Sequence, residues 1–244
     1  MKNKHQLVTL PLQDFIRKYE TDFRESHELQ QFDMDGRFIP LSSSKAKVFR
    51  RYAREQFFQN YSQYISFGQN KDMENYLRGN HPMRCAINDE ITHKTRNFFI
   101  VRKTNNHFEI CGYFALSIKI VGISQLKNEL KKEILLSGKG KTVEYIPVIF
   151  IAQFGKNTFI TDNPVNSKVL FEHIFPQLVH FQRIVGGKMV FLDSVVTTDN
   201  KIQSMYETLG FRAYGEPFED TSGNQILQPM GLDYSNLSSI VLAH

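Results

Sequence analysis

The chain has only two cysteines, Cys85 and Cys111, among its 244 residues. Two cysteines cannot build a disulfide scaffold, and these two do not have the spacing of metal ligands. No apolar run approaches the roughly 18–20 residues that cross a bilayer, and the longest run, residues 146–152, contains Pro147. The first residues, MKNKHQLVTLPL, include no small-residue cleavage site. We therefore expect a cytoplasmic protein with reduced thiols and no contact with membranes.

Several common binding motifs are also missing. The sequence contains neither G-x-x-x-x-G-K-[ST] nor G-x-G-x-x-G, which excludes the usual nucleoside-triphosphate and dinucleotide sites. The 8 histidines form no H-E-x-x-H pattern, so we expect no metal site. The composition, 41% hydrophobic and 23% charged, excludes a disordered or collagen-like chain and is typical of a globular protein. The net charge of +5 is a mild basic bias that does not by itself indicate nucleic-acid binding.

The first 95 residues are predicted to form a mainly helical N-terminal extension. Ser42 to Ser44 offer a helix N-cap, and residues 45–67 read as a helix. Apolar residues recur in it at helical spacing, at Phe57, Tyr61, Tyr64 and Ile65. A second short helix is expected at residues 71–78.

The rest of the chain, residues 96–244, alternates between strand and helix patterns. This alternation predicts an α/β fold, a mixed twisted sheet with flanking helices. A long crossover between Phe154 and Met189 indicates a parallel pair of strands. Pro176 lies inside one helix pattern and predicts a kink or a restart there. Strands are expected at 97–103, 107–121, 145–154, 188–196 and 225–232, and helices in the segment 124–141 and at 166–185 and 199–209.

One strand–loop–helix unit, residues 145–185, has the layout of an anion site. A loop that enters a helix gathers backbone N–H groups at the positive end of the helix dipole. Lys156 and Lys168 add positive charge, and the candidate caps are Asp162, Asn163, Asn166 and Ser167. The alternative is an ordinary α/β loop that binds nothing.

A second informative stretch is DNKIQSMYETLGFRAYG, residues 199–215. Asn200 begins a helix pattern and Gly210 ends it. Tyr206 lies on its apolar side, where it either packs in the core or donates a proton at the mouth of the sheet.

Together these stretches resemble the acyl-CoA N-acyltransferases of the GNAT superfamily. The resemblance rests on the strand–loop–helix–strand order, on Asn200, Tyr206, Gly210 and Phe211, and most of all on the motif YETLGF. The resemblance covers about residues 97–234. Within the family, the chain is similar to toxin-type and mobile-element members. It implies a GNAT-like core at residues 96–244, acetyl-CoA as co-substrate, and acetyl transfer to a primary amine by direct attack.

The loop before the expected helix departs from the family pattern. That pattern, Gln/Arg-x-x-Gly-x-Gly/Ala, uses glycines to bring the backbone close to a pyrophosphate. Here the loop reads DNPVNSK, and Asn166 and Lys168 occupy the positions of the small residues. Backbone N–H donors do not depend on the side chain, so the expectation of pyrophosphate binding is kept.

The resemblance also implies roles for individual residues. Residues 151–154 would separate from residues 190–193 to admit the amide arm of acetyl-CoA, and Tyr206 would protonate the departing thiolate. For the general base, Asp193, Glu144 and a water relay stay open, because residues 149–151 are apolar. The implied acetyl-CoA-binding residues are Gln153, Phe154, Gly155, Lys156, Asn166, Ser167, Lys168 and Asn200.

Two rival functions remain open. The segment from Lys45 to Arg54 (KAKVFRRYAR) carries five basic residues and no acidic one. It is either a solvated helix face or an RNA surface, since toxin members of the family acetylate charged tRNA and need phosphate contacts. A non-catalytic GNAT-like binding module is the third interpretation, and assembly as a homodimer also stays open.

Overall fold

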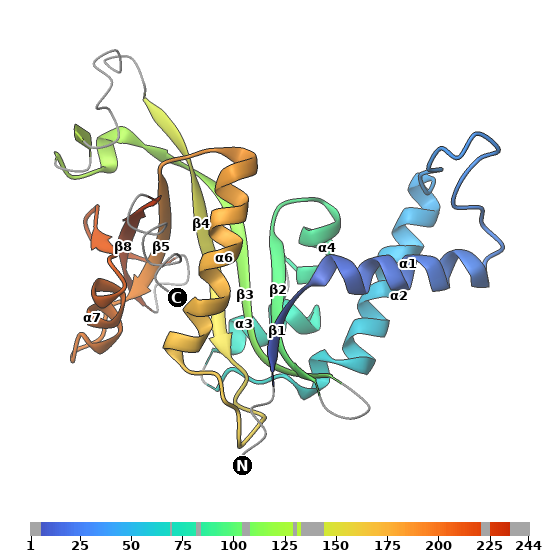
Figure 1. The fold of residues 1–244 in the computed structure, drawn as a ribbon, viewed down its shortest axis with the longest axis horizontal. Coiled ribbons are helices and arrows are strands. Elements are labelled where there is room, and N and C mark those ends of the chain that lie inside the picture. Colours follow the sequence, from blue (N-terminus) through green and yellow to red (C-terminus); the bar gives the residue numbers. More distant parts are fainter. Residues whose placement is uncertain are drawn as a thin grey trace. The chain divides into compact units, whose positions relative to one another are not determined.

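The computed structural model describes residues 6–68, 70–81, 84–103, 108–128, 131–132, 144–220 and 225–234. The chain divides into two compact units (Figure 1). The first consists of Met1–Ala115 and Gln153–Leu170, and the second of Leu116–Ala152 and Phe171–His244. Each unit therefore combines two separate stretches of the sequence.

The described strands form a mixed sheet in the order β1-β2-β3-β4-β5-β8-β6, with β7 paired to β8. β3 and β4 each contribute residues to both units. The sheet with its helices confirms the predicted mixed α/β fold. The strands are β1 Leu7–Pro11, β2 Arg96–Lys103, β3 Phe108–Gly122, β4 Tyr145–Lys156, β5 Met189–Val195, β6 Arg212–Ala213, β7 Phe218–Glu219 and β8 Ile226–Asp233.

The first unit joins N-terminal helices to strands β1 and β2. β1 pairs antiparallel with β2, from Leu7 opposite Arg102 to Pro11 opposite Phe98. This strand was not expected in a mainly helical segment. The boundary at residues 95 and 96 stays a prediction, although the first unit takes elements from both sides of it. Its helices are α1 Leu12–Ser26, α2 Ser43–Asn60, η1 Ser62–Tyr64, α3 Lys71–Arg78 and α4 Ala86–Ile91.

α1 and α2 pack on one another (Figure 1), and aromatic rings of both helices contact β2. The Phe57 ring stacks on Phe99 at 5.5 Å between centroids, and Phe15 meets both rings edge-on. Ser42 Oγ accepts the N–H of Lys45 at 3.5 Å, which confirms the predicted start of the helix. α2 ends at Asn60, earlier than predicted, because Tyr61 leaves the helical conformation and a short 3₁₀ turn follows.

The second unit is built on β5, which has one parallel and one antiparallel neighbour. β4 pairs parallel with β5 through Ile149–Val190 and Phe150–Phe191. β8 pairs antiparallel along the whole of β5, from Met189–Asp233 to Val195–Leu227. Gly231 of β8 faces the Phe191 ring, and a Cβ atom there would lie 2.6 Å from Phe191 Cε1.

The remaining helices of the described residues are the 3₁₀ helix η2 Ile123–Gln125, α6 Ser167–Val185 and α7 Lys201–Thr208. α6 runs through Pro176 as one helix, so the predicted restart is wrong. The apolar face that contains Phe171, Ile174 and Leu178 is buried, and its burial offsets the hydrogen bond that proline cannot donate. No helix among the described residues is long and apolar enough to cross a membrane. The helix expected in the segment 124–141 lies mostly outside the described residues.

Candidate functional site

The β4–β5 ladder stops in the middle of β4. Its last pair is Phe150–Phe191, and within the second unit Ile151 and Ala152 continue β4 without a ladder partner on β5. β5 itself continues to Val195. The pairing therefore ends where the resemblance implies that the two strands separate, and the backbone at this edge of β4 is left for other partners.

The carboxyl end of β4 carries four of the predicted site residues. Gln153 Oε1 is buried and has no hydrogen-bond partner among the described residues. Phe154 is half-buried. A Cβ atom at Gly155 would lie 2.8 Å from Phe67 Cδ1, so glycine here lets the Phe67 ring pack against the strand. Lys156 Nζ donates to the carbonyl oxygen of Asn163 at 3.2 Å, which ties it to the following loop.

Two buried asparagines fix the loop between β4 and α6. Asn157 Nδ2 donates to the carbonyls of Tyr64 at 3.1 Å and Ile110 at 2.7 Å. Asn163 Nδ2 donates to the carbonyls of Cys111 and Asn157, and its Oδ1 accepts the N–H of Val165 at 2.9 Å. Asn163 thus shapes the loop internally and is not the helix cap that was predicted.

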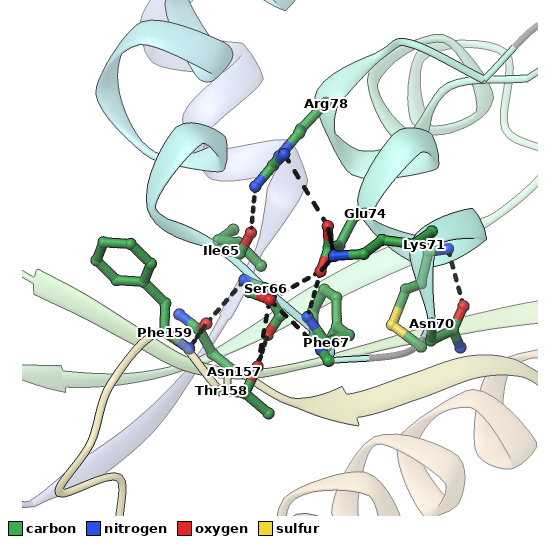
Figure 2. Close-up of polar contacts among 12 residues, drawn as sticks. Ile65, Ser66, Phe67, Asn70, Lys71, Glu74, Arg78, Asn157, Thr158 and Phe159 are labelled. Carbon is green, nitrogen blue, oxygen red and sulfur yellow. Dashed lines mark hydrogen bonds and ion pairs between the residues drawn. The ribbon is translucent and has the colours of Figure 1, made fainter.

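The segment before α3 holds this loop from outside (Figure 2). The N–H of Ser66 donates to Asn157 Oδ1 at 2.9 Å, and the N–H of Thr158 donates to the Ser66 carbonyl at 2.7 Å. Glu74 in turn accepts hydrogen bonds from the Ser66 hydroxyl at 2.8 Å and the Phe67 N–H at 2.9 Å. The contacts of Ser66 with Asn157 and Thr158 connect residues about ninety positions apart, and no local sequence pattern reveals them.

The Glu74 carboxylate is almost completely buried, with its side chain 4% exposed. Burial opposes its ionisation, but the hydrogen bonds from Phe67, Ser66 and Lys71 outweigh burial and lower the pKa of Glu74 below its ordinary value. Glu74 is therefore charged at neutral pH and anchors the segment that carries Ser66.

Asp162 also differs from its predicted role as a cap. Both of its carboxylate oxygens accept hydrogen bonds at 3.1 Å from Arg102, which is also paired with Glu109 at 2.6 Å. The pKa of Arg102 is raised, and the hydrogen bond to Asp162 is the largest cause. Asn166 is the cap of α6, because its Oδ1 accepts the N–H of Val169 at 3.0 Å.

The first turn of α6 presents Asn166, Ser167 and Lys168 to solvent. α6 is a helix of 19 residues, long enough to give a substantial dipole at this end. The loop contributes no glycine, so an anion here would meet the backbone of the helix turn and not a glycine cradle.

In the second unit, Tyr206 lies on α7 and is 6% exposed. Its ring meets Phe171 and Phe211 edge-on, each at 6.1 Å between centroids. Burial raises the pKa of Tyr206, so its hydroxyl keeps its proton at neutral pH. The packing role is observed, and the role as a proton donor stays a prediction.

The other predicted residues of this unit are Asp193, Asn200 and Glu144. Asp193 Oδ2 pairs with Lys119 Nζ at 3.1 Å, while its Oδ1 is buried and has no hydrogen-bond partner in the described part of the chain. Asn200 precedes α7 in the left-handed conformation, φ 51°, and its side chain makes no cap hydrogen bond. Glu144 is exposed just before β4.

No protein-family model and no curated protein matches the chain. Solved structures do match. A bacterial toxin aligns at 14% identity and a TM-score of 0.55, over 76% of this chain and 90% of its own. A mutant of KacT aligns at 13% identity and a TM-score of 0.53, over 74% of this chain and 92% of its own. AtaTR bound with AcCoA aligns at 14% identity and a TM-score of 0.51, over 74% of this chain and 91% of its own. At such low identity these similarities establish the fold, which is that of the GNAT-type toxin acetyltransferases.

Proposed function

We propose that this chain is an acetyl-CoA-dependent N-acetyltransferase that moves an acetyl group to a primary amine. The observation that carries the proposal is the end of the β4–β5 ladder at Phe150–Phe191 in a GNAT-type fold. The similarity of that fold to AtaTR bound with AcCoA supports acetyl-CoA as the co-substrate.

The residues at the end of β4 and the start of α6 suit the parts of acetyl-CoA. Gln153 Oε1 is a buried acceptor without a partner among the described residues, and it matches an amide N–H of the pantetheine arm. The first turn of α6, with Asn166, Ser167 and Lys168 exposed, suits the pyrophosphate. Phe154, Gly155 and Lys156 would contribute backbone, because Phe67 covers Gly155 and the Lys156 amine is held by Asn163.

In the second unit, we assign proton transfer to Tyr206 and Asp193. Bound acetyl-CoA would supply an activated acetyl thioester. The Tyr206 hydroxyl, kept protonated by burial, would give its proton to the departing sulfur. Asp193 Oδ1, which has no described partner, would accept the proton of the attacking amine, with Glu144 and a water relay as the alternatives. Asn200 would bind the pantetheine arm of acetyl-CoA with its side chain, which makes no cap hydrogen bond to α7.

Acetylation of charged tRNA is the second candidate function, and the surface of α2 favours it. Lys45, Lys47 and Arg51 are exposed on this helix, although Arg51 is paired with Glu55 at 2.9 Å. Exposed cations of this kind bind phosphates with an affinity that falls steeply with salt. An amine-acetylating enzyme without RNA contacts would show no such dependence on salt.

Calorimetric titration of acetyl-CoA into the full chain tests the proposal. We expect binding. Lys168→Gln should weaken it severalfold, whereas Lys188→Gln, at an exposed lysine that follows α6 in the sequence, should not. Incubation with labelled acetyl-CoA and either amines or charged tRNA then identifies the acceptor. Absence of binding at millimolar acetyl-CoA would refute the enzyme proposal and favour a non-catalytic module.

A further inference from the structure

The first unit contains a cleft of about 900 Å³. Its walls come from the end of α2 and the 3₁₀ turn after it, from the facing ends of β2 and β3, and from the loop after β4. None of the residues that we assign to acetyl-CoA lines it. The volume lies in the range of small-molecule sites, yet the proposed reaction does not use this cleft.

Three aromatic rings in the cleft wall remain in contact with solvent. Tyr64 is 54% exposed, Phe159 60% and Phe108 43%. The Tyr64 and Phe159 rings stand 6.2 Å apart at 63°. Leaving apolar surface in water forgoes about 25 cal/mol for each Å², and a group of such rings in one concave site is typical of a place where a ligand packs.

The Asn157 side chain holds the backbone of both Tyr64 and Phe159. Its Nδ2 donates to the carbonyl of Tyr64 at 3.1 Å. Its Oδ1 accepts the N–H of Phe159 at 3.0 Å (Figure 2). One buried side chain therefore fixes the backbone under both rings. Such a preformed pair loses little conformational entropy when a planar group binds.

Among the described residues of the cleft wall, one cation lies beside the rings. Glu109 and Asp162 line the cleft and share Arg102, so this single guanidinium offsets only one of the two carboxylates. Lys103, the next residue on β2, also lines the cleft and forms no ion pair within the described residues. Its ammonium is available to an anionic group beside rings that suit a planar group.

We propose that this cleft binds a nucleoside monophosphate, with its base against Tyr64 and Phe159 and its phosphate at Lys103. Bases stack on aromatic side chains without a requirement for one sequence, and a lysine ammonium binds phosphate as a point charge. The site is separate from the first turn of α6, so its ligand and acetyl-CoA bind independently.

Calorimetric titrations of the full chain with AMP, adenosine and inorganic phosphate test this assignment. We expect AMP to bind, adenosine to bind about tenfold more weakly because it lacks the phosphate, and phosphate alone not to bind at the same concentrations. Phe159→Ala should weaken AMP binding about tenfold through lost stacking. Lys103→Gln should reduce the affinity for AMP to that for adenosine and leave adenosine unaffected.

Matched variants exclude general effects. Phe58→Ala removes a 39% exposed ring of α2 that does not line the cleft, and Lys18→Gln removes an exposed cation of α1 that does not line it either. Both should bind AMP as the parent chain does. An unchanged thermal midpoint would confirm that Phe159→Ala is folded.

Three results would overturn the assignment: no binding of AMP at millimolar concentration, full affinity in Phe159→Ala, or displacement of AMP by acetyl-CoA. Failure of the acetyltransferase proposal gives a different pattern, in which acetyl-CoA does not bind while AMP still does.

Discussion

Asn157 offers the sharpest test of how the loop between β4 and α6 is held. Its side chain is 1% exposed and makes hydrogen bonds with Ser66, Phe159, Tyr64 and Ile110. Replacement of Asn157 by alanine would leave two N–H groups and two carbonyl groups without these partners. The loop would lose these side-chain bonds to the segment before α3 and to β3, and it would keep the bonds of Thr158 to Ser66 and of Asn163 to Cys111.

The expected loss of stability follows from these contacts. The bond to the Ile110 carbonyl is buried, and leaving that group unpaired costs about 1–3 kcal/mol. The other three partners are partly reached by water, and each lost bond costs about 0.5–1 kcal/mol. We expect Asn157→Ala to lower the free energy of unfolding by about 2.5–6 kcal/mol, and the thermal midpoint by about 5–24 °C.

Urea and thermal unfolding followed by circular dichroism measure this loss. Asn80→Ala is the control, because Asn80 is exposed in the same unit and its side chain forms no hydrogen bond with the described residues. That variant should change the free energy of unfolding by less than about 0.5 kcal/mol. A loss below about 1 kcal/mol for Asn157→Ala would show that water replaces these bonds and that the loop does not depend on them.

Three further predictions concern other parts of the chain. Tyr206→Phe should lower turnover at least about 100-fold and leave the dissociation constant for acetyl-CoA unchanged. Because burial raises the pKa of Tyr206, its ionisation should not reduce turnover up to about pH 9. Unaltered turnover of the variant would exclude Tyr206 as the acid. The pKa of Glu74 is lowered on folding, so its carboxylate stabilises the chain above its ordinary pKa of about 4.3 and less as the pH falls through the lowered value. The difference in urea stability between the parent and Glu74→Gln should therefore shrink from pH 7 to pH 3, whereas a constant difference would contradict the cited contacts. Gly231→Ala should lower the free energy of unfolding by about 1–3 kcal/mol, because the added methyl group overlaps the Phe191 ring. Gly122→Ala is the control: its added methyl group would lie 3.6 Å from the nearest atom, so its thermal unfolding should be nearly unchanged.

The sequence predicted the order of the longer elements in the second half of the chain because each has a strong local pattern, whereas the two-residue strand β7 was not predicted. β4, α6 and β5 carry apolar periodicity between clear turn residues, and their observed bounds lie within about two residues of the expected ones. β1 was missed because five residues before a helix give little periodic signal, and its partner β2 lies more than eighty residues away.

The candidate site was predictable in part for the same reason. The strand–loop–helix order located Gln153 to Lys168, and the YETLGF motif located Tyr206. The pairing of Asp162 with Arg102 and the role of Asn157 depend on residues distant in sequence. A single sequence contains no local pattern that links them.

The first unit combines two stretches that are separate in the sequence, and this affects how it folds during synthesis on the ribosome. A ribosome that has produced residues up to Ala115 has made most of this unit, but Ser66, Ile110 and Cys111 still await Asn157 and Asn163. Contacts across 91 and 52 residues slow folding, because the chain between them must first be closed into a loop. The nascent N-terminal part therefore stays incomplete until α6 has begun to emerge, and a fragment cut after Ala115 would lack the segment that completes it.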